Sequence, residues 1–235
     1  MFGVIGDPHI QLYGTDPDNL QEYRTTQWFR DNVERLSKLD LDFVLITGDL
    51  VHHGQMDEYN IAVSTLDRLH TKIYWCLGNH DVIFTHRMPG LPHVPRSPIY
   101  ELHPKQYVVR VGDYNLLVLS YFEWDKYPLE INQDLPSIAL IHQTSVTGTT
   151  LIFPLFDNPK LDDFLAEHNV TCVIQGHVHK AGHKEAYHKG IRYINVKAAE
   201  LGLGILGEPI LYVPVTRHES IEEARLKLLS MRRNT

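Results

Sequence analysis

Cysteine is scarce in this chain, with only Cys76 and Cys172 among 235 residues. Both lie in apolar stretches, and buried cysteines of this kind are typical of free thiols rather than of disulfides. Secreted proteins of the disulfide-rich classes are therefore excluded. We expect a protein of a reducing compartment, with the cytoplasm as its location.

Long apolar runs and an excess of basic charge are also missing. No stretch approaches the roughly 18 apolar residues of a membrane-spanning helix, and no basic segment precedes the first strand-like run at residues 2–6. We therefore expect neither a membrane span nor a secretory leader. The 22 Lys and Arg are outnumbered by 29 Asp and Glu, for a net charge of −7. Such a chain lacks the basic face that nonspecific nucleic-acid binding needs, so nucleic acid is not the favoured partner.

The order of apolar segments predicts an α/β protein. Runs at residues 2–6, 42–47 and 72–77 alternate with helical stripes such as Phe29, Val33 and Leu36, which is typical of a parallel sheet covered by helices. Residues 219–233 form an amphipathic pattern, which predicts a terminal helix packed on a single domain of residues 1–235; a homo-oligomer seam is the alternative. The remaining expected strands are 106–111, 114–120, 137–141, 170–175, 183–187, 191–196 and 210–216.

Polar side chains follow five of these apolar runs at the point where each run ends. Histidine is abundant, at 15 residues, and the carboxyl ends of strands are where sites form in layered α/β folds. We expect these ends to converge on one site. The polar residues in question are Asp7 and His9, Asp49, Asn79 with His80 and Asp81, His142, and His177 with His179.

This mixture of carboxylate, amide and imidazole groups predicts a transition-metal site. It contains no thiolate and has too much nitrogen for a calcium or magnesium cage, so Mn, Fe, Co, Ni or Zn fits it best. The groups are too many for one tetrahedral ion, which favours two divalent ions bridged by a carboxylate. Two such ions make the pocket locally positive, so a small phosphate ester is the expected substrate.

The motifs DPH, GDLVHHG, GNHD, an isolated His142 after a strand, and GHVH occur in this order. Together they resemble the calcineurin-like metallophosphoesterase family over roughly residues 1–200. The resemblance implies a four-layer αββα sandwich with two mixed β-sheets. It also implies that a hydroxide bridging the two metals attacks phosphorus, that His80 protonates the leaving oxygen, and that Asp81 orients the His80 ring. The implied metal ligands are Asp7, His9 and His179 for one ion, Asn79, His142 and His177 for the other, and Asp49 as the bridge.

The segment from Gly48 to Asp81 is similar to the class III cyclic-nucleotide phosphodiesterase branch, with Glu58 and Tyr59 at its EY pair. Purple acid phosphatases place a metal-binding tyrosine three residues after the bridging aspartate; here that position holds His52, which argues against a tyrosinate site. His52 and His53 either line the pocket or are exposed loop residues. The expected substrate contacts are Asn79, His80, His53, His86 and Arg87.

The leading hypothesis from these residues is a metal-dependent phosphoesterase that hydrolyses a small phosphodiester, with a cyclic nucleotide as one candidate. A phosphomonoesterase, a nuclease subunit that works with a partner, and a binding scaffold without catalysis stay open as alternatives. His142 is followed by Gln143 and Thr144, where the family usually has a Pro-containing sequence. We therefore expect the substrate contact next to His142 to differ from the family pattern.

Overall fold

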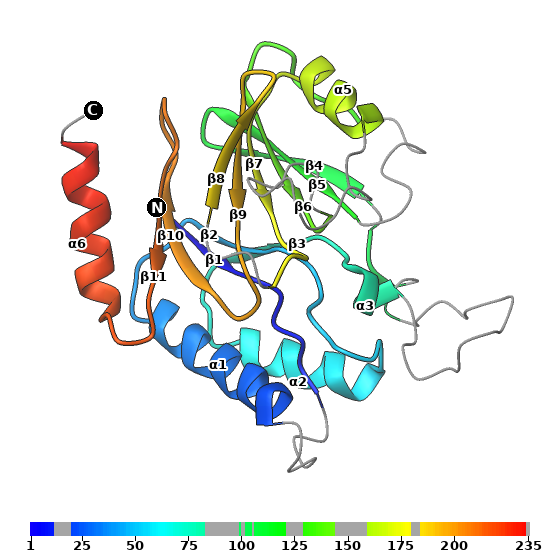
Figure 1. Cartoon of the computed structure of the whole chain (residues 1–235), viewed down its shortest axis with the longest axis vertical. Coiled ribbons are helices and arrows are strands. Elements are labelled where there is room, and N and C mark those ends of the chain that lie inside the picture. Colours follow the sequence, from blue (N-terminus) through cyan, green and yellow to red (C-terminus); the bar gives the residue numbers. More distant parts are fainter. Residues whose placement is uncertain are drawn as a thin grey trace, which may run out of the picture.

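A computed structural model describes residues 1–11, 20–82, 99, 102–104, 106–120, 129–143, 159–179 and 184–233. Figure 1 shows two β-sheets packed face to face, with helices on the outer side of each sheet. Among the described helices, none combines the length and apolar character that crossing a bilayer requires. Cys76 and Cys172 are both buried and free, which confirms the expectation of buried thiols.

The first sheet contains the three parallel strands that the sequence predicts near the N-terminus. Two further strands extend it in the antiparallel sense, because β1 pairs antiparallel with β10 and β10 with β11. The sheet is therefore mixed. Its strands, in spatial order, are β11 (Leu211–Val215), β10 (Leu201–Ile205), β1 (Phe2–Ile5), β2 (Phe43–Ile46) and β3 (Lys72–Trp75).

The second sheet is also mixed. Strands β5, β6, β7 and β9 run parallel, and the edge strands β4 and β8 are antiparallel to their neighbours. The two expected hairpins are confirmed, since β4 pairs with β5 and β8 with β9. The strands, in spatial order, are β4 (Gln106–Val111), β5 (Tyr114–Leu119), β6 (Ser137–Ile141), β7 (Val170–Gln175), β9 (Ile191–Asn195) and β8 (Lys184–His188).

Three apolar cores separate four layers. Along β2, Phe43 and Leu45 point into the core between the two sheets, while Val44 and Ile46 point toward the helices, because successive side chains of a strand face opposite ways. The helical core of the first sheet is closed by α1 (Leu20–Leu36), α2 (Met56–Leu66) and α6 (Ile221–Arg232), and α5 (Pro159–Glu167) covers the second sheet. The expected four-layer αββα sandwich is confirmed.

Strand β10 is absent from the sequence prediction. Its sequence, LGLGI, contains two glycines, which are depleted in strands and weaken a strand pattern. The structure shows why they are needed: a Cβ on Gly202 would lie 2.1 Å from the Tyr212 hydroxyl, and one on Gly204 would lie 2.2 Å from the Phe2 ring. Large aromatic side chains from the neighbouring strands fill the space that two side chains of β10 would otherwise occupy.

Candidate metal centre

The seven predicted ligands lie together where strands of both sheets end. Within each sheet these strands are parallel, since β1 pairs with β2 and β2 with β3, and β6 pairs with β7. Their carboxyl ends therefore open at the same edge, as the sequence pattern predicts. A direct bond joins the two sheets at this edge, because the His142 Nδ1 donates to the Thr47 carbonyl oxygen at 2.8 Å.

One set of side chains, which we call the first ligand group, comprises Asp7, His9, Asp49 and His179. One ligand atom from each lies within 4.8 Å of the others. The Nε2 atoms of His9 and His179 face each other at 2.9 Å. The His9 Nε2 lies 3.5 Å from Asp49 Oδ2, and the His179 Nε2 lies 3.5 Å from Asp7 Oδ2.

A second ligand group converges on the Nε2 atom of His142. This nitrogen lies 3.0 Å from Asn79 Oδ1, 3.1 Å from His177 Nδ1 and 3.2 Å from Asp49 Oδ2. Asp49 Oδ2 therefore faces both ligand groups. This is the position that a bridging carboxylate occupies between two ions.

The donor atoms present fit metal ions. Ligands about 2.1 Å from a tetrahedral ion lie roughly 3.4 Å apart, and the contacts within both groups span 2.9 to 3.5 Å. Asp49 Oδ2 is buried and, among the described residues, has no hydrogen-bond partner. A buried carboxylate oxygen without a donor is costly unless a cation neutralises it. The site therefore has the spacing and the donor types of a metal centre, and Asp49 Oδ2 lies between imidazole nitrogens of His9 and His142.

The backbone at the site is strained in the way functional sites often are. Asp7, His9, Asp49 and His177 have positive φ angles of 23°, 46°, 46° and 73°, which non-glycine residues rarely adopt. The glycine before Asn79 and the one before His177 also have a steric role. A Cβ on Gly78 would lie 2.1 Å from Asp49 Oδ1, and one on Gly176 would lie 2.1 Å from Asp7 Oδ1.

Thr47 is a supporting residue that the sequence motifs do not reveal. Its hydroxyl donates to Asp7 Oδ1 at 2.6 Å and accepts from the Asp7 backbone N–H at 3.2 Å. Its carbonyl oxygen accepts from His142 Nδ1. A carbonyl only accepts, so His142 Nδ1 carries a proton and Nε2 is the atom presented to a metal. A threonine before a Gly-Asp pair gives no signal of this role in a single sequence.

The protonation of the carboxylates favours cation binding. Burial alone would raise the pKa of Asp7 and Asp49, but the positive charge of His142 and its hydrogen bonds outweigh burial and hold both pKa values well below the usual range. The pKa of His142 is correspondingly raised, because the two carboxylates overcome the cost of burying its charge. In the metal-free protein, a proton on His142 thus partly replaces the charge of a cation.

Other histidines are held neutral. Burial lowers the pKa of His9 and of His177 to about 4, although the nearby carboxylates of Asp49 and Asp7 act against the shift. Metal binding requires neutral imidazole. These two rings are therefore ready to bind an ion without first losing a proton near neutral pH.

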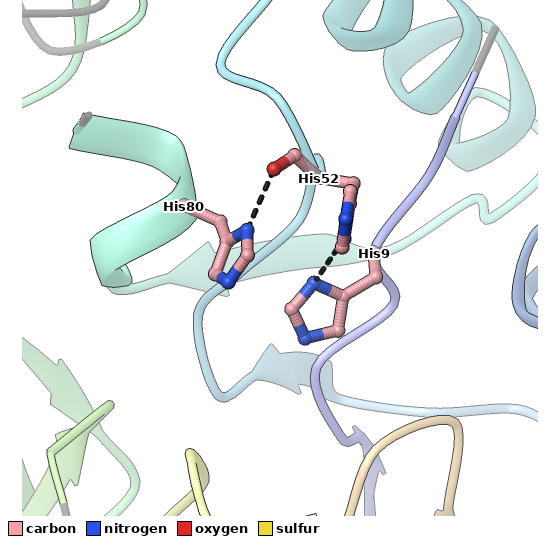
Figure 2. A group of neighbouring side chains, drawn as sticks. All are labelled: His9, His52 and His80. Atoms are coloured by element: carbon pink, nitrogen blue, oxygen red, sulfur yellow. Dashed lines mark hydrogen bonds between the residues drawn. The ribbon is translucent and has the colours of Figure 1, made fainter. Parts of the chain in front are cut away.

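His80 lies beside the first ligand group, with its ring centroid 4.7 Å from that of His9. It is the second residue of the short helix α3 (Asn79–Val82). Figure 2 shows its Nδ1 directed at the His52 carbonyl oxygen, 2.6 Å away. Because that oxygen can only accept, Nδ1 holds a proton and Nε2 is the atom available for chemistry.

The structure differs from the prediction that Asp81 orients the His80 ring. Asp81 is buried, and its two carboxylate oxygens accept backbone N–H groups of Val51 and Gly78 at 3.0 and 2.8 Å. Burial and the charge of Asp49 raise its pKa to about 8, while the two N–H donors act against the shift. The physical reason for the difference is α3 itself: adjacent residues of a helix point in different directions, so Asp81 anchors the loops around the site instead.

His52 and His53 are both half-buried, so neither is a fully exposed loop residue, and His52 contacts a predicted ligand. The Nδ1 of His52 lies 3.2 Å from the Nδ1 of His9 (Figure 2), on the side of the ring away from the metal-facing Nε2. His52 therefore contacts the predicted ligand His9 on the side of its ring that faces away from the metal position. His86 and Arg87, the two other expected substrate contacts, lie outside the described residues.

Comparison with known proteins agrees with this geometry. Residues 1–181 match the calcineurin-like phosphoesterase family. The chain belongs to this family. Calcineurin-like phosphoesterases are metal-dependent hydrolases, and this member carries a His and Asp cluster suited to metal.

Individual relatives agree with the family assignment. A 3′,5′-cyclic-nucleotide phosphodiesterase of Nostoc is 25% identical over 183 residues, which cover 73% of this chain and 69% of that one. Two solved structures share the fold. A dimetal phosphatase from Danio rerio superposes with a TM-score of 0.63 at 12% identity, covering 91% of this chain and 95% of the other. A phosphopantetheinyl hydrolase from Mycobacterium tuberculosis gives 0.53 at 16% identity, covering 84% and 89%.

Proposed function

We propose that this protein is a dinuclear-metal phosphodiesterase that hydrolyses a small phosphodiester, with a cyclic nucleotide as the leading substrate. The observation that carries the proposal is the position of Asp49 Oδ2, a buried oxygen without a hydrogen-bond partner among the described residues that faces both ligand groups. The similarity to a protein named as a 3′,5′-cyclic-nucleotide phosphodiesterase supports the substrate class. The buried free cysteines support a cytoplasmic location.

In this proposal the first ligand group holds one ion and the second ligand group holds the other. Bound divalent ions would supply Lewis-acid stabilisation of the phosphoryl oxygens and would lower the pKa of a nearby water. The protein's own part is to keep the imidazoles of His9 and His177 neutral and to hold Asp49 between the two groups. Asn79, His80 and His53 would contact the phosphate from the open side.

His80 would protonate the leaving group. Hydrolysis forms a bond from the water oxygen to phosphorus and breaks the bond from phosphorus to the leaving oxygen. The leaving oxygen takes its proton from His80 Nε2, and the proton of the attacking water passes to solvent. His80 suits this role because the His52 carbonyl occupies Nδ1 and leaves Nε2 on the open side of the ring.

The decisive assay uses the chelated protein with added Mn²⁺ and bis(p-nitrophenyl) phosphate. We expect turnover that depends on the metal and exceeds turnover of p-nitrophenyl phosphate. A panel of cyclic nucleotides, linear dinucleotides and phosphomonoesters then ranks the natural substrate classes. Preference for the monoester would replace the proposal with a phosphomonoesterase, and preference for nucleic acid would replace it with a nuclease. Metal binding without any turnover would indicate a binding scaffold.

A further inference from the structure

The peptide group between His52 and His53 is hydrogen-bonded to side chains through both its carbonyl oxygen and its N–H. Its carbonyl oxygen, which belongs to His52, accepts from His80 Nδ1 at 2.6 Å. Its N–H, which belongs to His53, donates to Glu58 Oε2 at 2.9 Å. A carboxylate, a peptide group and the ring of His80 therefore form one continuous chain of hydrogen bonds.

Glu58 is unusually placed for a glutamate. Its side chain is fully buried, and Oε1 accepts from His53 Nδ1 at 2.7 Å. Glutamate is almost never fully buried unless it is paired, and here both of its oxygens are bonded to His53. The carboxylate is thereby fixed in one orientation, facing the peptide that His80 contacts.

Helix capping alone does not account for this arrangement. Glu58 is the third residue of α2 and also reaches back to the Gln55 N–H, but at 3.5 Å, which is the longest of its contacts. The same capping motif occurs in α6, where Glu223 accepts from the Ser220 N–H at 2.7 Å. Glu223 therefore shows what a glutamate that only caps a helix does. The two shorter hydrogen bonds of Glu58 are instead accepted from His53, which lies beside the site.

A carboxylate bonded to a peptide N–H makes the carbonyl of the same peptide a stronger acceptor, because hydrogen bonds in a chain strengthen one another by about 10–30% each. A stronger acceptor at the His52 carbonyl holds the proton of His80 on Nδ1. Asp81, whose oxygens are used by two backbone amides, does not supply this effect.

We propose that Glu58 is the positioning carboxylate of His80 and that it acts through the His52–His53 peptide group instead of touching the imidazole. The proposal rests on the proposed function, in which His80 is the acid that protonates the leaving oxygen. Glu58 also holds the ring of His53, an expected substrate contact. A loss that acts through His53 would not depend on the leaving group, so only a loss that does depend on it reports on His80.

The test compares two leaving groups. Methyl phenyl phosphate releases a poor leaving group that needs a proton, and methyl p-nitrophenyl phosphate releases a good one that does not. Glu58→Met keeps the side-chain length and removes the acceptors. We expect it to lower kcat on the phenyl ester by about 10–100-fold, as removal of a supporting partner does at metal sites, with a much smaller loss on the p-nitrophenyl ester.

Three further variants make the result specific. Glu58→Gln keeps one acceptor oxygen for the His53 N–H, so it should recover part of the lost rate. Glu223→Met removes the matched capping glutamate of α6 and should leave both rates unchanged while it lowers the melting temperature. His80→Ala serves as the reference: it should lower kcat more on the phenyl ester than on the p-nitrophenyl ester.

A second readout does not use activity. The ¹⁵N shifts of the His80 ring report which nitrogen holds the proton, and they can be recorded on the metal-free protein. We expect the Nδ1–H form in the wild type and a shift toward the Nε2–H form in Glu58→Met, with no change in Glu223→Met.

The outcomes separate this inference from the function on which it rests. If His80→Ala discriminates between the two esters but Glu58→Met slows both equally, or leaves the His80 ring unchanged, Glu58 is only a structural residue and the inference fails alone. If His80→Ala also slows both esters equally, the acid assignment fails and the inference fails with it. If no phosphodiester is turned over, the proposed function itself is overturned.

Discussion

The two ligand groups share Asp49 but differ in how open they are. The second ligand group closes around His142, whose ring is fully buried and bonded through Nδ1 to Thr47 of the other sheet. The first ligand group ends at His179, whose side chain is 41% exposed, and His80 lies next to its His9. The difference lies in these two histidines: His142 belongs to the core that joins the sheets, whereas His179 lies at the surface, and Asn79 and His177 of the second group are half-buried.

The largest effect should come from the residue that both groups share. Asp49→Asn keeps the shape of the side chain and removes its charge, so we expect loss of metal from both groups. Because each ion contributes several kcal/mol of stabilisation, phosphodiesterase activity should fall by more than about 10⁴-fold. Elemental analysis after dialysis measures the metal content. Retention of two equivalents would refute the shared role of this carboxylate.

His80 should affect the rate and leave the metals in place. We expect His80→Ala to retain wild-type metal content and to lose about 10²–10⁴-fold in kcat, which is the usual contribution of a positioned acid. Steady-state kinetics and metal analysis on the same preparation check both halves of the prediction. A variant with normal kcat would remove His80 from the reaction.

The contrast between the groups is sharpest when one histidine is removed from each. In the metal-free protein, His142→Ala leaves the buried carboxylates of Asp7 and Asp49 without their partner, so we expect a loss of about 3–5 kcal/mol in the free energy of unfolding. His179→Ala removes an exposed side chain and should change it by no more than about 0.5 kcal/mol. Urea unfolding of chelated protein measures both values, and equal losses would contradict the difference between the groups.

The pH also controls the stability of the metal-free protein. Folding lowers the pKa of His9 and His177 from 6.5 to about 4, so between these pH values the unfolded chain binds protons that the folded chain does not. These two histidines make stability fall as pH falls from 6.5 to 4, by up to about 1.4 kcal/mol per pH unit for each proton. Asp81, whose pKa is raised to about 8, binds a proton in the folded chain over this range and offsets about one of the two. His142 has a raised pKa, so its contribution is present at low pH and is lost only as pH rises through its folded pKa.

Urea midpoints across this pH range test the sign of the effect. His9→Gln removes one of the two titrating groups and should make the dependence shallower between pH 6.5 and 4. A midpoint that rises on acidification over this range would show that the buried rings are protonated in the folded protein.

Much of the fold could be predicted from the sequence because local pattern controls it. Strands buried on both faces, such as β2, read as continuous apolar runs, and the glycine and polar residue after each run mark the edge where the site forms. Strand β10 could not be found in this way. Its two glycines are explained by Tyr212 and Phe2, which approach only after the sheet has formed.

The sequence by itself determined the family, the order of the strands near the N-terminus and the set of side chains that gather at the site, since these depend on residue types and spacings along the chain. Only the tertiary structure decided how those side chains are connected. Asp81 follows His80 directly in the chain but anchors two backbone amides, while Glu58, more than twenty positions earlier, reaches the ring of His80 through a peptide group. The physical reason is that hydrogen bonding depends on direction as well as proximity, and direction is fixed only when helices and loops pack in three dimensions.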